Sequence, residues 1–115
     1  MKTLEKTDAI SLQDRELLIE VAKIVHQDLP DATILLYGSA ARGTRQPDSD
    51  YDILVLTDHP LAKATEDRIE DAIFALELDR ETLISTTYYT AAEWNDPMRE
   101  AELFHQEVEK DAIAL

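Results

Sequence analysis

Two short clusters of residues carry the side-chain types that bind phosphate and divalent metal ions. The first is Gly38-Ser39, and the second is the pair Asp50 and Asp52, which begins ten residues later. Glycine lets the backbone approach a bulky anion because it has no Cβ, and a serine at a helix start offers a hydroxyl near the positive end of the helix dipole. Arg42 adds a guanidinium that would either reach a phosphate or lock the loop. By itself, a Gly-Ser step is more typical of a plain turn and N-cap.

The two aspartates have the spacing of metal ligands on one face of a strand. Residues i and i+2 of a strand share a face and lie roughly 6.5 Å apart, so Asp50 and Asp52 are expected to converge on the same ions. Mg²⁺ takes one or two carboxylates and completes its shell with water and substrate phosphate. Two such ions, about 3.5–4 Å apart, would hold the attacking and leaving oxygens of an in-line displacement. Because an isolated Asp-x-Asp is usually solvated or capping, the joint occurrence with Gly38-Ser39 carries the prediction.

The stretch that contains both clusters resembles a known family. Gly38-Ser39-Ala40-Ala41-Arg42-Gly43, followed by Asp50-Tyr51-Asp52, is similar to the signature of the DNA polymerase β-like nucleotidyltransferase superfamily. The short chain resembles the minimal nucleotidyltransferases, which in many prokaryotes are the antitoxin partners of HEPN-domain toxins. The resemblance spans residues 33–94. It implies an enzyme that uses Mg²⁺, as two ions, to transfer AMP from ATP to a tyrosine hydroxyl of a HEPN toxin held in a hetero-oligomer.

The family pattern also implies a third carboxylate on a later strand, several residues before a helix cap. Glu81 falls at that position, at the head of the stretch 81–89, which is rich in β-branched and aromatic residues. Asp79 is the alternative third ligand if the strand starts early, and the usual family residue is aspartate rather than glutamate. The resemblance thus assigns catalytic and metal-binding roles to Asp50, Asp52 and Glu81, and nucleotide-binding roles to Gly38, Ser39 and Arg42.

Two other functions stay open. A weak or inactive nucleotidyltransferase-like module would neutralise its partner by masking it, with acidic patches that imitate RNA. Glutamate at position 81 favours this interpretation, whereas the intact Gly38-Ser39 and Asp50/Asp52 clusters oppose it. A small-molecule adenylyltransferase of the aminoglycoside-modifying type would need an acceptor pocket. One small domain does not supply such a pocket unless dimerisation builds it.

Length and charge restrict the choice further. A chain of 115 residues predicts a single domain over 1–115. The formal charge of −14, from 25 acidic and 11 basic residues, disfavours direct nucleic-acid binding and suits docking on a basic protein. The sequence has no cysteine, which excludes disulfides and thiolate metal sites. No apolar run approaches the roughly 18 residues of a membrane span, so we expect a cytoplasmic protein without membrane contact.

The elements that must position the two clusters follow from hydrophobic periodicity and capping signals. The predicted fold class is α/β, of the polymerase β-like nucleotidyltransferase type, with a small mixed sheet of three or four strands flanked by helices. The expected strands lie at 33–37, 50–56 and 81–89. The first expected helix has about 15 residues, starts at Ser11 and ends before Pro30, and a short second helix runs from Gly38-Ser39 to Gly43. Two later helices are expected at about 61–76 and 98–109. Thr90 is expected to cap a further helix that follows the third strand.

Overall fold

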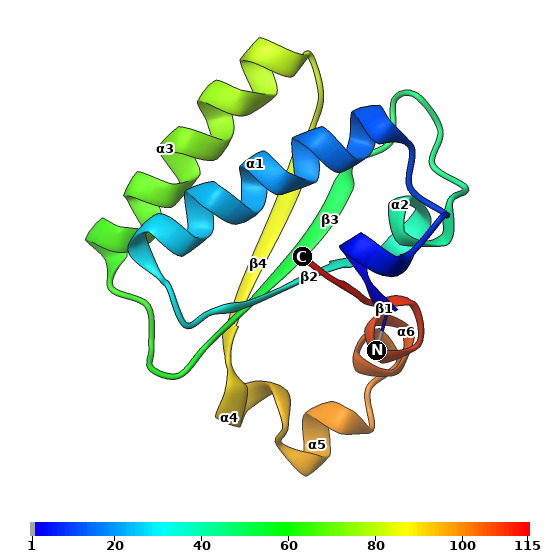
Figure 1. Ribbon diagram of the computed structural model, residues 1–115. Coiled ribbons are helices and arrows are strands. Elements are labelled where there is room, and N and C mark those ends of the chain that lie inside the picture. The colour runs from blue at the N-terminus through cyan, green and yellow to red at the C-terminus, as the bar shows by residue number, and fades with distance from the viewer. Residues whose placement is uncertain (1) are drawn as a thin grey trace.

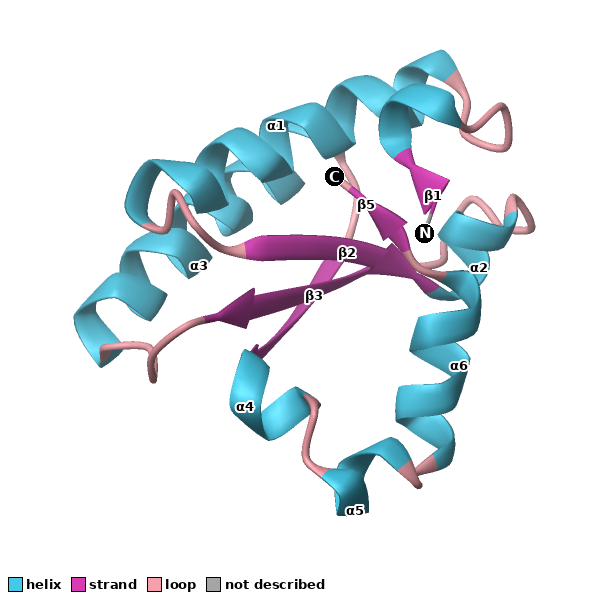
Figure 2. Cartoon of the chain, turned by 60° about the horizontal axis from the view of Figure 1, so that its bottom comes forward, coloured by secondary structure: helices cyan, strands magenta, loops and turns pink. Residues whose placement is uncertain are grey.

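The structure, a computed structural model, describes residues 2–115 and is built on a five-stranded mixed sheet with helices on both faces (Figures 1 and 2). The strand order is β1-β5-β2-β3-β4; β2 runs antiparallel to β3 and β5, whereas β3 is parallel to β4 and β1 to β5. This confirms the predicted α/β class, with five strands in place of three or four. The strands are β1 (Lys2–Thr3), β2 (Thr33–Tyr37), β3 (Tyr51–Thr57), β4 (Ile84–Thr90) and β5 (Ile113–Ala114).

Two long helices lie together on one face of the sheet, and three short ones lie on the other (Figure 2). The first layer holds α1 (Leu12–Asp28) and α3 (Lys63–Arg80), and the second holds α4 (Ala91–Trp94), α5 (Pro97–Glu100) and α6 (Leu103–Asp111). The helix α2 (Gly38–Arg42) follows β2 directly, and a 3-10 turn, η1 (Leu4–Lys6), follows β1. Among residues 2–115, no helix combines the length and the apolar character that a membrane crossing requires.

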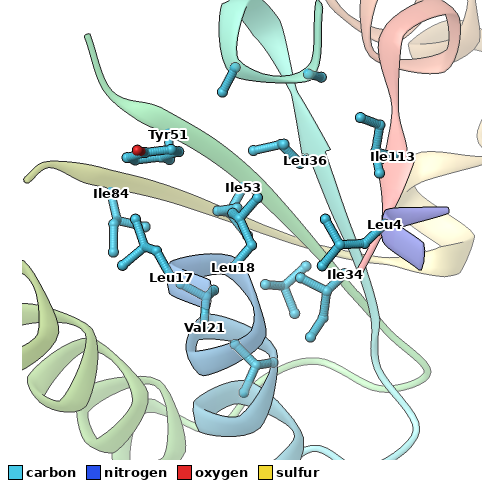
Figure 3. Close-up of a cluster of buried hydrophobic side chains, with 14 of the residues drawn as sticks. Leu4, Leu17, Leu18, Val21, Ile34, Leu36, Tyr51, Ile53, Ile84 and Ile113 are labelled. Atoms are coloured by element: carbon cyan, nitrogen blue, oxygen red, sulfur yellow. The ribbon is translucent and has the colours of Figure 1, made fainter. Parts of the chain in front are cut away.

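Alternation along β3 divides its side chains between the two layers. Tyr51, Ile53 and Val55 are buried in the larger core against α1 and α3 (Figure 3). Leu54 is buried on the other face, in a second cluster with Trp94 and Val108. Since alternate strand residues point to opposite faces, Asp52 belongs to the face of Leu54. Burial of each such aliphatic side chain stabilises the fold by about 1.5–3 kcal/mol, so the register of β3 is strongly fixed.

Capping chemistry fixes where several helices begin, as the sequence predicts. The Ser11 hydroxyl accepts the backbone N–H of Asp14 at the start of α1. Thr90 and Glu93 form a complete capping box at α4, in which each side chain accepts the other residue's backbone N–H. Asp96 caps α5, and a proline occupies its first turn. These caps satisfy backbone donors that a helix leaves without partners, which sets the helix starts locally.

The end of α3 differs from its prediction. The helix continues to Arg80 instead of ending near Leu76, because the intervening residues favour helix and none of them breaks it. Glu81 then ends the helix in a left-handed conformation, with φ of 51°. As a result, β4 begins at Ile84, and neither Asp79 nor Glu81 lies on a strand. The helix predicted over 98–109 is divided into two helices, α5 and α6. After α6, the C-terminal tail forms β5 and pairs with β2.

Candidate active site

The turn from β2 into α2 packs directly against the carboxylate of Asp52. Tyr37, the last residue of β2, is paired with Asp52 in the antiparallel ladder, so the chain turns beside this carboxylate. Gly38 has φ of +75°, and a Cβ built on it would lie 2.4 Å from the Asp52 Oδ2 atom. Only glycine fits here, for both reasons. The structure therefore brings together the two clusters, Gly38-Ser39 and the aspartate pair, that the sequence places ten residues apart.

The two aspartates repel one another at the head of β3. Asp50 lies just before the strand and is exposed, whereas Asp52 is half-buried. Burial raises the pKa of Asp52, the negative charge of Asp50 raises it further, and the positive charge of Arg42 opposes them. Two neighbouring oxygen-donor carboxylates are well matched to a divalent cation, which would relieve the repulsion between their negative charges.

Arg42 connects α2 to the end of α6. Its Nη1 atom lies 2.6 Å from the Asp111 Oδ2 atom, and the Asp111 side chain is only 10 % exposed. Gly43 then closes α2 with φ of 75°, as the sequence predicts, and its N–H donates to backbone carbonyls of the helix. Arg42 therefore locks the turn, and its effect on the pKa of Asp52 places its charge close to the site.

Tyr51 anchors the Asp-x-Asp segment from the opposite face of the sheet. Its hydroxyl donates to the carboxylate of Asp14 on α1, and the Arg45 guanidinium stacks 4.0 Å from the centre of its ring. Burial, helped by Asp14, raises the pKa of Tyr51 to about 12. Because Tyr51 points into the core, its two neighbours Asp50 and Asp52 are directed away from α1. The sequence analysis gave Tyr51 no role, although an aromatic residue between two strand aspartates was a signal for this anchor.

Comparisons with known proteins identify the family of this chain. A family model for the nucleotidyltransferase domain matches residues 18–110. The chain belongs to the nucleotidyltransferase domain family. This nucleotidyltransferase is 27% identical over 101 residues to the probable protein adenylyltransferase MntA of Haemophilus influenzae, and the match covers 88% of each chain.

Two solved structures of toxin–antitoxin complexes have a similar fold. A chain of the crystal structure of a toxin–antitoxin with AMP-PNP superimposes with a TM-score of 0.58 and 20% identity, over 84% of the nucleotidyltransferase described here and 69% of that chain. A chain of a mutant MntA-HpeT toxin–antitoxin crystal structure gives a TM-score of 0.57 and 21% identity, over 85% and 70% of the two chains. At this identity the likeness establishes the fold.

The third carboxylate expected for the nucleotidyltransferase does not lie on β4. Glu81 is exposed at the end of α3, where it lines a recess with Asp14 and Tyr51, on the side of α1. Asp79 lies within α3, and its Oδ2 atom is 3.4 Å from the Nε atom of Arg80. Within residues 2–115, no group of three or more histidine, aspartate or glutamate side chains is placed to hold a metal ion. The predicted strand positions of Glu81 and Asp79 are wrong because α3 extends further than its pattern indicated.

An aromatic wall lies on the same sheet face as Asp52. Tyr37 meets the edge of Phe104 with ring centres 5.6 Å apart, and Trp94 contacts Phe104 at 5.9 Å and Tyr89 at 5.5 Å. Burial raises the pKa of Tyr37, and the charge of Asp52 adds to the effect. These rings come from β2, β4, α4 and α6 and fix the second helical layer beside the candidate active site. Sequence analysis did not find this wall because its members are spread over 37–104.

Proposed function

We propose that this nucleotidyltransferase is a Mg²⁺-dependent protein adenylyltransferase that transfers AMP from ATP to a tyrosine hydroxyl of a HEPN-domain toxin and thereby acts as its antitoxin. The observation that carries the proposal is the contact between the Gly38 turn and the Asp52 carboxylate. It joins a phosphate-binding type of turn to a cation-binding pair, which is what nucleotidyl transfer requires. The similarity to MntA, a probable protein adenylyltransferase, supports a protein acceptor, and the similarity to chains of two toxin–antitoxin complexes supports the antitoxin role.

The donor set fits one Mg²⁺ ion. Asp50 and Asp52 offer only carboxylate oxygens, and their mutual repulsion gives a divalent cation a favourable place. When bound with ATP, the ion supplies charge neutralisation for the phosphates and stabilises the departing pyrophosphate. Asp50 and Asp52 would hold this ion, and the Ser39 hydroxyl and the start of α2 would hold the phosphates. Arg42 would add positive charge beside them while its bond to Asp111 keeps the turn in place.

The transfer step is a displacement at the α-phosphorus of ATP. The acceptor hydroxyl oxygen forms the new bond to phosphorus, the bond from phosphorus to the oxygen that bridges to the β-phosphate breaks, and pyrophosphate leaves with its electron pair. The hydroxyl proton passes to water. The chain contributes position, through the fixed start of β3, and a strongly negative surface that attracts a basic acceptor protein. We place this reaction in the cytoplasm, where ATP and Mg²⁺ are supplied.

The experiment is a label-transfer assay with the partner toxin. ATP labelled at the α-phosphorus should label the toxin, whereas ATP labelled at the γ-phosphorus should not, because the leaving group carries the γ-phosphate. The double variant Asp50→Asn/Asp52→Asn should transfer no label. Label arriving from the γ-position would show phosphoryl transfer instead and would overturn the proposal.

A masking function is the second candidate, and one observation favours it. The residue of β4 that is paired with Asp52 is Ser85, so this position carries no carboxylate. A masking module would neutralise the toxin by binding alone. In that case Asp50→Asn/Asp52→Asn would protect cells from the toxin as well as the unmodified chain does, whereas an adenylyltransferase would lose this protection.

A further inference from the structure

The pairing of β3 with β4 identifies the residue nearest to Asp52 on the neighbouring strand. The two strands are parallel, and the ladder pairs Asp52 with Ser85 and Leu54 with Thr87. Paired residues of neighbouring strands point to the same face and lie about 4.8 Å apart in the backbone. If β4 supplied a third metal ligand beside Asp50 and Asp52, that ligand would therefore be the side chain at position 85.

The face of β4 beside the aspartates carries hydroxyl groups and no carboxylate. Ser85, Thr87 and Tyr89 alternate along it, and Ser85 and Thr87 are half-buried. The acids nearest in sequence, Asp79 and Glu81, lie in or at the end of α3 instead. Neither β4 nor the end of α3 therefore adds a carboxylate to the aspartate pair, which agrees with the lack of any three-residue metal-binding group within residues 2–115.

This donor set supports one divalent cation. A single Mg²⁺ bound with ATP is matched by one or two protein carboxylates, since phosphate and water complete its shell. A second divalent cation about 3.5–4 Å away would need further negative charge, because two positive ions at that distance repel strongly unless anionic ligands lie between and around them. The neutral hydroxyl of Ser85 does not supply that charge.

We propose that this chain binds a single divalent cation with its nucleotide, because Ser85 occupies the sheet position from which a third carboxylate would complete a site for a second ion. The inference rests on the proposed function, since it concerns the same aspartate pair. It predicts slow AMP transfer by the natural chain, because only one ion offsets the charge that develops in the transition state. It also predicts that Ser85→Asp creates the second ion site and makes the transfer faster.

The test counts bound Mn²⁺ by electron paramagnetic resonance, with one equivalent of AMP-PNP per chain. The unmodified chain should bind one ion. Ser85→Asp should bind two, and their close approach should broaden the Mn²⁺ signal through spin–spin coupling. Ser85→Asn is the matched control, since it has nearly the size of Asp without the charge, and it should bind one ion. Ser85→Glu provides a second acidic variant if Ser85→Asp fails to fold, which the fluorescence of buried Trp94 reports.

The outcomes separate the inference from the proposed function. Two ions in the unmodified chain would overturn the inference and leave the adenylyltransferase proposal standing. One ion in every folded variant, including the acidic ones, would also overturn it, because position 85 would then not decide the count. Failure of the unmodified chain to bind any Mn²⁺ with AMP-PNP would instead remove the proposed function, and the inference with it.

Discussion

Substitution of Gly38 by alanine should weaken both the fold and the nucleotide site, because Gly38 packs against Asp52. The added Cβ would lie 2.4 Å from the Asp52 Oδ2 atom, and the residue would have to keep φ of +75°. The left-handed conformation costs about 1–2 kcal/mol for a residue with a Cβ. Displacement of the Asp52 carboxylate from a packed position adds about 1–2 kcal/mol. We expect Gly38→Ala to lose about 2–4 kcal/mol of unfolding free energy, the sum of these two costs, and to lose Mg·ATP binding.

Gly43→Ala is the matched control for this change. Gly43 has the same φ of +75°, but a Cβ there would meet the Ala9 carbonyl oxygen at 3.3 Å, away from the aspartates. It should therefore show the backbone cost of about 1–2 kcal/mol and little of the second contribution. Because the turn at Gly38 is untouched, Gly43→Ala should retain Mg·ATP binding.

Urea denaturation, followed by the fluorescence of the single tryptophan Trp94, measures the stabilities, and calorimetry measures Mg·ATP binding. A double-mutant cycle with Asp52→Ala isolates the clash, because the Oδ2 atom is then absent. The cost of Gly38→Ala should fall by about 1–2 kcal/mol in the Asp52→Ala background. If Gly38→Ala lowers the unfolding free energy equally with Asp52 present and with Asp52→Ala, or if it leaves the Mg·ATP affinity unchanged, the contact between the turn and Asp52 is not the basis of the site.

Substitutions at three other positions test the supporting contacts. Thr90→Ala removes the oxygen that caps α4 and should cost about 1 kcal/mol in urea denaturation. Arg42→Met leaves the mostly buried Asp111 without its cation and should cost about 1–3 kcal/mol, with Arg42→Lys recovering part of the loss. Burial and the hydrogen bond to Glu70 raise the pKa of Tyr88 above its usual 10.0. The stability that comes from its neutral hydroxyl is therefore fully present below pH 10 and is lost as the pH rises above 10 towards the raised pKa. Tyr88→Phe should remove the most alkaline step of tyrosine ionisation, which is measured by absorbance.

The parts of the site that the sequence predicts correctly depend on local signals. The strand 33–37 is apolar at nearly every position, and Gly38 and Gly43 mark the two ends of the short helix that follows. The Asp50 and Asp52 pair marks the head of the next strand. Each of these features is determined within a few residues, so turn and strand chemistry alone place them.

The parts that the sequence misses depend on contacts between distant segments. The end of α3 has no glycine or proline to mark it, and a glutamate adopts the left-handed conformation there. The pairing of Asp52 with Ser85 joins strands that are separated by an entire helix. No local pattern reports a strand register of this kind, so the sequence alone did not show that Ser85, and not Glu81, is paired with Asp52.

The intact mass of the partner protein shows whether the site built on the aspartate pair transfers AMP to it. The protein encoded next to this chain, as the proposed toxin, should be incubated with the chain, ATP and Mg²⁺, in parallel with Asp50→Asn/Asp52→Asn. We expect the partner protein to gain one or more AMP units with the unmodified chain and none with the variant. If the partner's mass is unchanged while it forms a stable complex with this chain and its toxicity is neutralised, the chain is not an adenylyltransferase and masking is its function.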